Sequence, residues 1–308
     1  MIQHPTKILV FGKNGQLGKA FQELFKDQVH VTFVDRHICD LTNTSQILST
    51  LNHYQPQIIF NAAAYTAVDL AEKESKIAFA INALAPEIMA QYICQTSHGV
   101  FVHFSTDYIF DGLQKEPYQE TDIPNPLSMY GKSKLTGELA IQHIFKQSTI
   151  TTSKYLILRT SWVYGDGGNF IKTMLKLAQE REHLKVIADQ YGVPTSADWL
   201  AKIAKTLTQS QASSGIYHAV PDGKTSWWEL ACFVIRTAKE IGFHLKVQEE
   251  NIRAIPATEY PLPAPRPYNS LMDNRKLKEA LNLINFREFP EWKAPTQEYV
   301  KKLIQQKN

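Results

Sequence analysis

Two residues suited to proton transfer, Tyr130 and Lys134, lie four positions apart near the middle of the chain. Side chains at this spacing share one face of a helix. A phenol has an ordinary pKa of about 10, and a neighbouring ammonium lowers that pKa because it stabilises the phenolate. The pair is therefore a candidate general acid with its activating cation. An exposed pair on a helix surface is the structural alternative.

A further hydroxyl, that of Thr106, follows the predicted strand Val100–Phe104 in the run Ser105-Thr106-Asp107. It can donate a hydrogen bond to the same substrate oxygen that a tyrosine acid would protonate. A Tyr and a Lys four residues apart are common by chance. Their place after this strand, and downstream of a glycine-rich turn, favours a catalytic interpretation.

The glycine-rich turn follows the predicted strand Ile8–Phe11 and has the spacing GxxGxxG, with glycines at 12, 15 and 18. Gly12 permits a tight turn, Gly15 lets the backbone approach a pyrophosphate, and Gly18 lets the next helix pack closely on the strand. The helix N-terminus adds unpaired N–H groups and a positive dipole end. The turn predicts dinucleotide binding, with a plain strand–helix turn as the alternative.

Residues beyond the second predicted strand, Val29–Val34, bear on which dinucleotide binds. Asp35 can accept hydrogen bonds from the adenosine ribose, which suits NADH. Arg36 follows at once and can pair with a 2′-phosphate, which suits NADPH. Asp40 and Leu41 can border the adenine, although Asp40 can instead cap a helix. NADPH and NADH both remain candidate cofactors.

The elements that must position these residues alternate along the first half of the chain. Short apolar runs predict buried strands, and apolar residues at helical spacing predict helices between them. The strands are Ile8–Phe11, Val29–Val34, Ile58–Phe60, Val100–Phe104 and Tyr155–Arg159, and the helices are Leu17–Phe25, Thr44–Leu51, Ser75–Thr96 and Ser128–Phe145. This order predicts an α/β fold with a Rossmann-type, doubly wound parallel sheet, which binds ligands beyond the carboxyl ends of its strands.

The second half of the chain has a looser pattern and predicts a smaller domain. We expect residues 1–160 to form an NAD(P)-binding domain and residues 161–308 to form mainly a substrate-binding domain. Phe170–Glu182 and Trp227–Ile241 read as helices that pack back on the first domain. The stretch Ile255–Pro267 holds five of the fifteen prolines and predicts an extended segment.

Composition and charge narrow the class of protein. Of the 308 residues, 44% are hydrophobic and 20% are charged, as in globular proteins, and the net charge is +3. This balance predicts neither a nucleic-acid nor a membrane partner, and no apolar run reaches the roughly 18 residues of a membrane span. Three scattered cysteines and a polar N-terminus favour the cytoplasm. The histidines are scattered too, so we assign no metal site.

Seven segments carry a family resemblance: FGKNGQLG at 11–18, NAAAYTAVD at 61–69, STDYIF at 105–110, YGKSK at 130–134, RTSWVY at 159–164, DQYGVPT at 189–195 and RPYNS at 266–270. In these the chain resembles the extended short-chain dehydrogenases/reductases and, more closely, the dTDP-4-dehydrorhamnose reductase family. The first and fourth segments indicate only the superfamily. The third, fifth and sixth segments narrow the resemblance to the reductases.

The resemblance implies a reaction in which the 4-keto group of dTDP-4-dehydro-L-rhamnose is reduced to dTDP-L-rhamnose by NADPH or NADH. Tyr130 would donate the proton, Lys134 would hold the nicotinamide ribose and lower the pKa of Tyr130, and Thr106 would assist at the substrate oxygen. Trp162 and Arg266 would contact the sugar nucleotide. The alternatives are that Trp162 is a core aromatic residue and that Arg266 anchors the backbone.

The binding residues follow from the motifs and the resemblance together. The cofactor-binding set is Gly12, Gly15, Gln16, Leu17, Asp35, Arg36, Asp40, Leu41, Ala63, Ala64, Tyr65, Thr66, Phe104, Tyr130 and Lys134. The set for the sugar nucleotide is Thr106, Asp107, Trp162 and Arg266, of which Arg266 is the candidate for the diphosphate.

Two other functions share this frame. One is a non-catalytic regulatory subunit of methionine adenosyltransferase, which resembles the reductases through much of the chain. The other is a nucleotide-sugar epimerase or dehydratase, whose acid–base groups beside the threonine usually include more than the Asp107 found here. The resemblance also makes a homodimer a candidate assembly. Some relatives bridge dimers with a metal ion through glutamates, but no motif places such glutamates in this chain.

Overall fold

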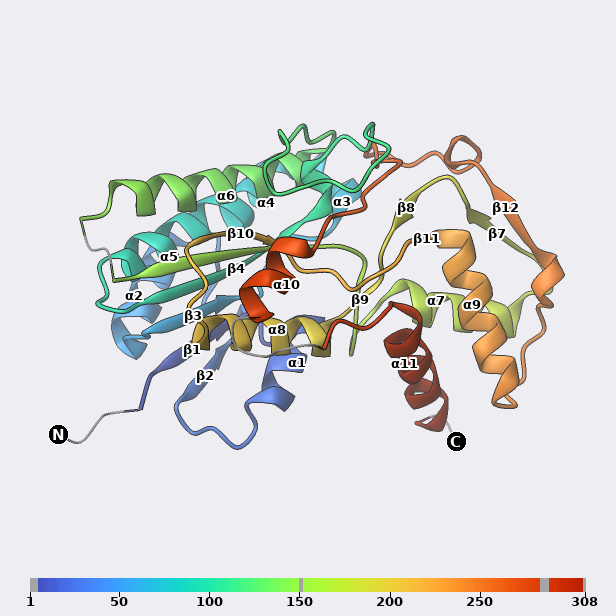
Figure 1. Ribbon diagram of the computed structural model, residues 1–308, viewed down its shortest axis with the longest axis horizontal. Coiled ribbons are helices and arrows are strands. Elements are labelled where there is room, and N and C mark those ends of the chain that lie inside the picture. Colours follow the sequence, from blue (N-terminus) through green and yellow to red (C-terminus); the bar gives the residue numbers. More distant parts are fainter. Residues whose placement is uncertain (1–4, 150–151, 283–287, 307–308) are drawn as a thin grey trace.

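A six-stranded parallel sheet forms the larger lobe of the molecule (Figure 1). The computed structural model describes residues 5–149, 152–282 and 288–306. The strands are β1 (Ile8–Phe11), β2 (Val31–Val34), β3 (Ile58–Asn61), β4 (Val100–Thr106), β5 (Lys154–Thr160) and β10 (Gly215–His218). Their order across the sheet is β10-β5-β4-β3-β1-β2. The predicted Rossmann-type α/β fold is confirmed.

Helices cover both faces of this sheet because its strands are apolar on both faces. One face packs on α2 (Thr44–Tyr54), α5 (Ala85–Cys94) and α6 (Met129–Gln147), and the other on α1 (Gln16–Leu24), α8 (Ala197–Gln209) and α10 (Arg275–Asn282). On β1, Leu9 and Phe11 join the first of these cores and Val10 joins the second. Successive side chains of a strand point to opposite faces, which explains this division.

The predicted helix Ser75–Thr96 is present as a continuous helical stretch with a wider turn in its middle. It consists of α4 (Ser75–Phe79), a π-helical turn (Ala80–Leu84) and α5. Residues 75–94 are long and apolar enough to cross a membrane, with a mean hydropathy of 1.4. More than half of this stretch is buried against the rest of the protein. Such burial is typical of the core helix of a globular domain.

The smaller lobe has a core of its own. Its helices are α7 (Phe170–Glu180), α9 (Trp227–Glu240) and α11 (Lys293–Gln305), and they pack on the parallel pair β7 (Leu184–Ile187) and β12 (Ile252–Ile255). The sequence predicts that the helices near 170–182 and 227–241 pack back on the first domain. The apolar faces of α7 and α9 meet each other in this second core.

Two helices and a strand from the second half of the chain return to the sheet. In α8 the buried positions include Leu200, Ile203 and Leu207, and they pack against α1 and the sheet. Strand β10 extends the sheet beyond β5, and α10 packs beside it. Residues after 160 therefore complete the larger lobe as well as building the smaller one.

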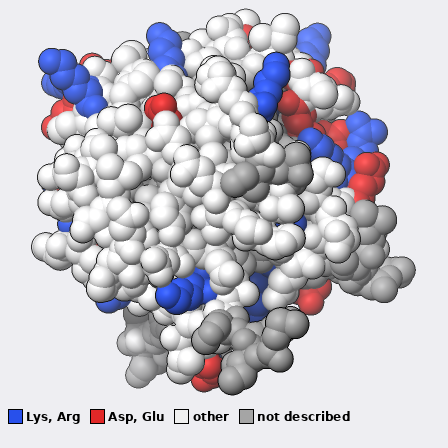
Figure 2. All heavy atoms as spheres, turned by 90° about the vertical axis from the view of Figure 1, so that its left-hand side faces the viewer, with Lys and Arg blue, Asp and Glu red and all other residues white. Residues whose placement is uncertain are grey.

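Short elements complete the description of the fold. They are α3 (Val68–Ala71), the 3₁₀ turn Asp107–Ile109, β6 (Val163–Tyr164), β8 (Tyr191–Gly192), β9 (Thr195–Ser196), β11 (Thr225–Ser226) and the 3₁₀ turns Glu249–Asn251 and Ala257–Glu259. The last of these turns interrupts the proline-rich segment, which is otherwise largely extended. Figure 2 shows the end of the larger lobe opposite the smaller one, where charged side chains lie mainly around the margin.

Candidate active site

Tyr130 lies in the first turn of α6, directly beside the end of β4. The helix begins at Met129 because the Ser128 hydroxyl accepts a hydrogen bond from the Gly131 N–H at 3.1 Å. The Tyr130 side chain is half-buried, and its ring meets the Tyr108 ring edge-on at 5.9 Å. The phenol lies close to the Thr106 side chain. The predicted meeting of Tyr130 and Thr106 at the edge of the sheet is therefore present.

The pKa of Tyr130 is raised to about 12. The sequence instead predicts that the Lys134 ammonium lowers it. Burial is the main cause of the raised pKa, the nearby Thr106 hydroxyl opposes it, and the Asp107 charge adds to it. Tyr130 consequently carries its proton throughout the neutral range. This protonation state is the one that an acid needs to donate a proton to a substrate oxygen.

Lys134 lies one turn further along α6 and is almost fully buried. Its Nζ donates to the Phe104 carbonyl at 2.6 Å and lies 3.1 Å from the His103 ring nitrogen Nε2. Burial lowers the pKa of Lys134 to about 8, and the Glu138 charge opposes this effect. The ammonium thus bonds to β4 in this structure. Lys134 is not among the groups that shift the pKa of Tyr130.

Asp107 lies between Thr106 and a residue from the second half of the chain, Ser270. The Thr106 hydroxyl donates to Asp107 Oδ1 at 3.0 Å and accepts from the Tyr108 N–H. Burial raises the pKa of Asp107 to about 6, and the nearby hydroxyls of Ser270 and Thr106 oppose this effect. Ser270 belongs to the RPYNS segment but was not predicted as a site residue, because its partner lies 163 residues away in the sequence.

The glycine-rich turn has the geometry of a dinucleotide cradle. Gly12 has a φ of +88°, and a Cβ there would lie 2.7 Å from the backbone of Ala62. A Cβ on Gly18 would lie 2.0 Å from the Gly12 carbonyl oxygen. At Gly15 the nearest atom to a Cβ is that same oxygen at 3.4 Å, and no side chain caps the N-terminus of α1. The turn therefore offers open backbone N–H groups to a pyrophosphate.

Gln16 and Leu17, both predicted to line the pyrophosphate, differ in what their side chains do. Gln16 donates to the Val163 carbonyl at 3.2 Å and accepts from the Asn169 amide at 3.2 Å, so it ties the cradle to the loop before α7. Leu17 is buried in the core beneath the sheet. Leu17 can therefore serve a pyrophosphate through its backbone rather than its side chain.

The loop after β2 holds the residues predicted to meet the adenosine. Asp35 accepts hydrogen bonds from the His37 N–H at 3.0 Å, the Ile38 N–H at 3.3 Å and the Asn14 amide at 3.4 Å. Asp40 accepts from the backbone and the hydroxyl of Thr42, while Asn43 caps α2. Both carboxylates thus shape the loop, and their contact with adenosine stays a prediction.

Arg36 is exposed beside Asp35, and we expect it to contact the 2′-phosphate of NADPH. The change Arg36→Ala is expected to weaken NADPH binding about tenfold, because an arginine–phosphate contact is lost, and to leave NADH binding nearly unchanged. Titration of both nucleotides by fluorescence measures the two affinities. Arg181→Ala, at another exposed arginine, controls for the loss of charge. Equal losses for the two nucleotides would refute this assignment.

The segment after β3, which supplies Ala63, Ala64, Tyr65 and Thr66 to the predicted cofactor site, is held by a residue that sequence reasoning missed. Asn82 accepts from the Tyr65 N–H at 2.9 Å and donates to the Tyr65 carbonyl at 3.0 Å. The same amide donates to the Ser133 hydroxyl on α6 at 3.0 Å. The π-helical turn carries Asn82, and such turns are frequent at functional sites.

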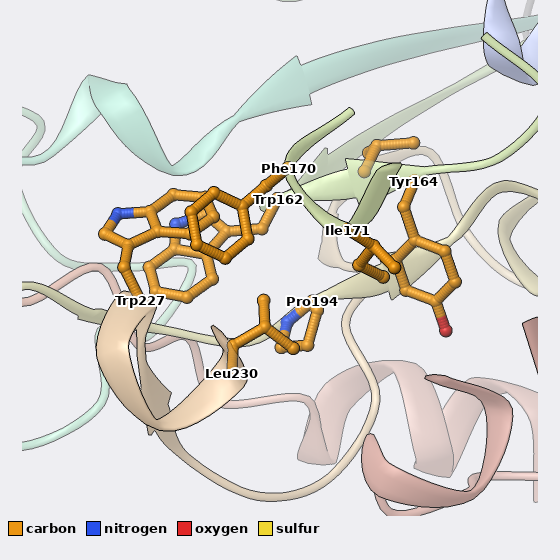
Figure 3. Close-up of a pocket in the computed structure, with 8 residues that line it drawn as sticks. Trp162, Tyr164, Phe170, Ile171, Pro194, Trp227 and Leu230 are labelled. Carbon is orange, nitrogen blue, oxygen red and sulfur yellow. The ribbon is translucent and has the colours of Figure 1, made fainter. Parts of the chain in front are cut away.

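Trp162 lies beyond the end of β5 in a backbone conformation that is rare for a bulky residue, with a φ of +46°. Its ring lies face to face with the Trp227 ring, as Figure 3 shows. The ring centroids are 3.5 Å apart and the planes are 11° from parallel. Phe170 packs against the Trp227 ring, and these side chains line a small apolar pocket. Trp227 was not predicted, because nothing in its local sequence separates it from a core aromatic residue.

Trp227 is expected to hold Trp162 in place for the sugar nucleotide. The change Trp227→Ala removes a stacking partner worth about 0.5–1.5 kcal/mol and is expected to raise the KM for the sugar nucleotide roughly three- to tenfold. The kcat should change less, because Trp227 is remote from the reacting bond. Steady-state kinetics measures both. Trp228→Phe, at the neighbouring tryptophan, is the control, and an equal rise in KM there would contradict the assignment.

Arg266 pairs with a carboxylate of the larger lobe. Its two terminal nitrogens each lie 2.7 Å from an oxygen of Asp69, and Nη1 also donates to the Ala264 carbonyl. This bidentate pair fastens the proline-rich segment to α3. The guanidinium is largely buried and already compensated by Asp69, which favours anchoring. Contact with a diphosphate would require Asp69 to share it.

The fold and the site define a dinucleotide-dependent enzyme of the extended short-chain dehydrogenase/reductase type. A parallel doubly wound sheet carries a glycine cradle at one strand end and a tyrosine, a lysine and a threonine near another. Residues 6–305 match the model of the RmlD substrate binding domain family. The chain belongs to the dTDP-4-dehydrorhamnose reductase family, as its similarity to individual relatives also shows.

Three relatives illustrate this similarity. The chain is 41% identical to the dTDP-4-dehydrorhamnose reductase of Salmonella typhimurium over 92% of this chain and 94% of that protein. The structure of a dTDP-4-dehydrorhamnose reductase from Clostridium acetobutylicum is similar with a TM-score of 0.85 and 35% identity, covering 97% of this chain and 99% of that one. The Bacillus anthracis reductase, crystallised with NADP, gives a TM-score of 0.85 and 33% identity over 97% and 100%.

Proposed function

We propose that the protein reduces the 4-keto group of dTDP-4-dehydro-L-rhamnose to dTDP-L-rhamnose with NADPH or NADH, the last step of dTDP-rhamnose synthesis. The observation that carries the proposal is the placement of the Tyr130 hydroxyl beside Thr106, one helical turn from Lys134, beyond the carboxyl ends of the strands. Relatives named for this activity cover nearly the whole chain, which supports the choice of substrate.

Each residue of the site has a separate role in the proposed reaction. Thr106 and Tyr130 present two hydroxyls to the keto oxygen, and Tyr130 donates its proton to that oxygen as the alcohol forms. Lys134 holds the nicotinamide ribose through its ammonium. The reduced nicotinamide supplies the hydride to the carbonyl carbon. The glycine cradle fixes the pyrophosphate, and residues 1–160 chiefly bind the cofactor while residues 161–308 chiefly bind the sugar nucleotide.

The burial of the site also favours proton transfer from Tyr130 to the keto oxygen. Asp107 and Lys134 are buried, so few water molecules compete with the tyrosine for the keto oxygen. Trp162, stacked on Trp227, faces the sugar, and Asp107 accepts a hydrogen bond from the substrate or from Thr106. A homodimer and a cytoplasmic location remain parts of the proposal, and sedimentation of the purified protein would test the first of these.

The kcat/KM for the reduction is expected to fall as the pH rises above about 8. Burial lowers the pKa of Lys134 to about 8, so the ammonium that holds the ribose loses its proton through this range. Tyr130 keeps its proton there because its pKa is raised to about 12. The decline should approach tenfold per pH unit. A kcat/KM that stays constant to about pH 10 would rule out Lys134 as the titrating group.

Product analysis separates this proposal from its alternatives. Incubation with NADPH and dTDP-4-dehydro-L-rhamnose, followed by NMR of the sugar, should show a new proton at C4 and one NADPH consumed per product. An epimerase would change the configuration of a sugar without net consumption of NADPH. A regulatory subunit would bind NADPH, leave the sugar unchanged and copurify with methionine adenosyltransferase. Either result would overturn the proposal.

A further inference from the structure

A chain of three buried polar side chains crosses from the sheet to the catalytic helix. Asn61 ends β3, His103 lies within β4, and Lys134 lies on α6. Each is at most 1% exposed. The His103 ring nitrogen Nδ1 lies 3.1 Å from the Asn61 side-chain amide, and Nε2 lies 3.1 Å from Lys134 Nζ. No motif of the sequence analysis includes His103.

The Lys134 ammonium depends on His103 as a hydrogen-bond acceptor, because the nearby carboxylate is bonded to another residue. The carboxylate that acts on Lys134 is Glu138, on the same helix. Glu138 is committed to Arg159, whose guanidinium donates to it at 2.7, 3.1 and 3.2 Å. The buried ammonium of Lys134 instead donates to uncharged acceptors, the Phe104 carbonyl and the His103 ring. Loss of an acceptor from a buried ammonium is costly because water cannot replace it.

The tautomer of His103 follows from the ammonium. An ammonium has only N–H donors, so the His103 Nε2 beside it must be an acceptor. A neutral imidazole then carries its proton on Nδ1, which faces Asn61. Burial and the Lys134 charge keep the pKa of His103 well below its ordinary value, so the ring stays neutral.

Asn61 can select this tautomer. Its Oδ1 is buried and has no hydrogen-bond partner among the described residues, while its Nδ2 faces His103. A half-turn of the amide exchanges the two atoms and places the oxygen against the Nδ1–H of His103. The carboxamide oxygen then accepts the proton that fixes the ring.

We propose that His103 is a positioning residue for Lys134, with Asn61 setting the His103 tautomer that accepts the ammonium proton. Together with the Phe104 carbonyl, His103 takes two of the three ammonium protons and leaves one for the hydroxyls of a nicotinamide ribose. This inference rests on the proposed function for the role of Lys134. It adds a histidine that acts through the lysine and touches neither cofactor nor substrate.

Two substitutions of His103 test the proposal. His103→Phe removes the acceptor, and we expect NADPH to bind about tenfold more weakly and the alkaline decline of kcat/KM to begin about one pH unit lower. His103→Gln keeps an acceptor oxygen and should restore both values to within about threefold of the wild type. NADPH affinity is read from nucleotide fluorescence and does not depend on turnover.

His218 supplies the matched control. It is also fully buried, it lies on β10, and its ring is 3.5 Å from Arg159 rather than from Lys134. His218→Phe should lower the unfolding temperature without changing NADPH affinity or the alkaline decline. If His103→Phe fails to fold, Asn61→Ala takes its place and should weaken NADPH binding at least about threefold.

The outcomes separate this inference from the proposed function. Unchanged NADPH affinity and an unchanged alkaline decline in His103→Phe would overturn the role of His103 while the reductase activity stands. Equal effects in His218→Phe would also overturn it, because they would indicate a general loss of packing. Absence of turnover in the wild type would overturn the proposed function, and NADPH affinity would still report on His103.

Discussion

Replacing Tyr130 with phenylalanine is expected to lower kcat by at least about a hundredfold, the usual contribution of a positioned acid. The change removes the one hydroxyl that carries the transferred proton and keeps the ring, whose edge-on contact with Tyr108 survives. NADPH affinity should change less than about threefold, because the phenol has no charge to contribute at neutral pH. Single-turnover kinetics with the keto sugar measures the chemical step directly.

Tyr92→Phe is the control for this experiment. Tyr92 is a half-buried tyrosine on α5 whose ring packs in the core on one face of the sheet. Its substitution removes a hydroxyl of the same kind and should leave kcat near the wild-type value. A Tyr130→Phe variant that retains more than about a tenth of the wild-type kcat would show that another group supplies the proton.

The largest effect on stability is expected at Glu138. Its carboxylate and the Arg159 guanidinium are both almost fully buried and share three hydrogen bonds. Glu138→Gln leaves the arginine charge buried without a counter-charge, which is expected to lower the free energy of unfolding by about 3–5 kcal/mol. His218 beside Arg159 cannot replace the carboxylate, because a neutral imidazole carries no negative charge.

Urea unfolding of Glu138→Gln and of Glu23→Gln separates a buried pair from an exposed one. Glu23 pairs with Lys26 on the surface, where water and salt screen an ion pair so that it contributes little to stability. A loss below about 1 kcal/mol for Glu138→Gln would mean that the Arg159 charge finds water or another acceptor after the change.

The parts of this molecule that could be predicted from sequence are those with local causes. The strand Ile8–Phe11 is an apolar run bounded by Gly12, and such a run of four residues can be satisfied only by burial on both faces. Since the carboxyl ends of parallel strands meet at one edge, placing Thr106 at the end of a strand was enough to place it near the catalytic helix.

The remaining parts depend on contacts between distant residues. The helices α7 and α9 have apolar faces that would fit a sheet or each other equally well, and only the path of the intervening chain decides between them. The pKa of Tyr130 was expected to fall because sequence spacing shows a nearby lysine. Spacing does not show that the lysine bonds to Phe104 and His103 instead.

The residues that contact the site residues could not be predicted from the sequence either. Asn82 is a single polar residue in an apolar helix, which more often marks a satisfied core amide than a support for a cofactor segment. Ser270 and Trp227 reach the site from the second half of the chain, and no local pattern links them to Asp107 or Trp162.

The most direct test of the account is NADPH oxidation by the purified protein with dTDP-4-dehydro-L-rhamnose as the sole substrate. The account predicts steady oxidation that depends on the keto sugar, stops when the sugar is exhausted and is lost in Tyr130→Phe. Protein that binds NADPH tightly but oxidises it no faster with the keto sugar than without it would contradict the assignment of Tyr130, Lys134 and Thr106 as a reductase site.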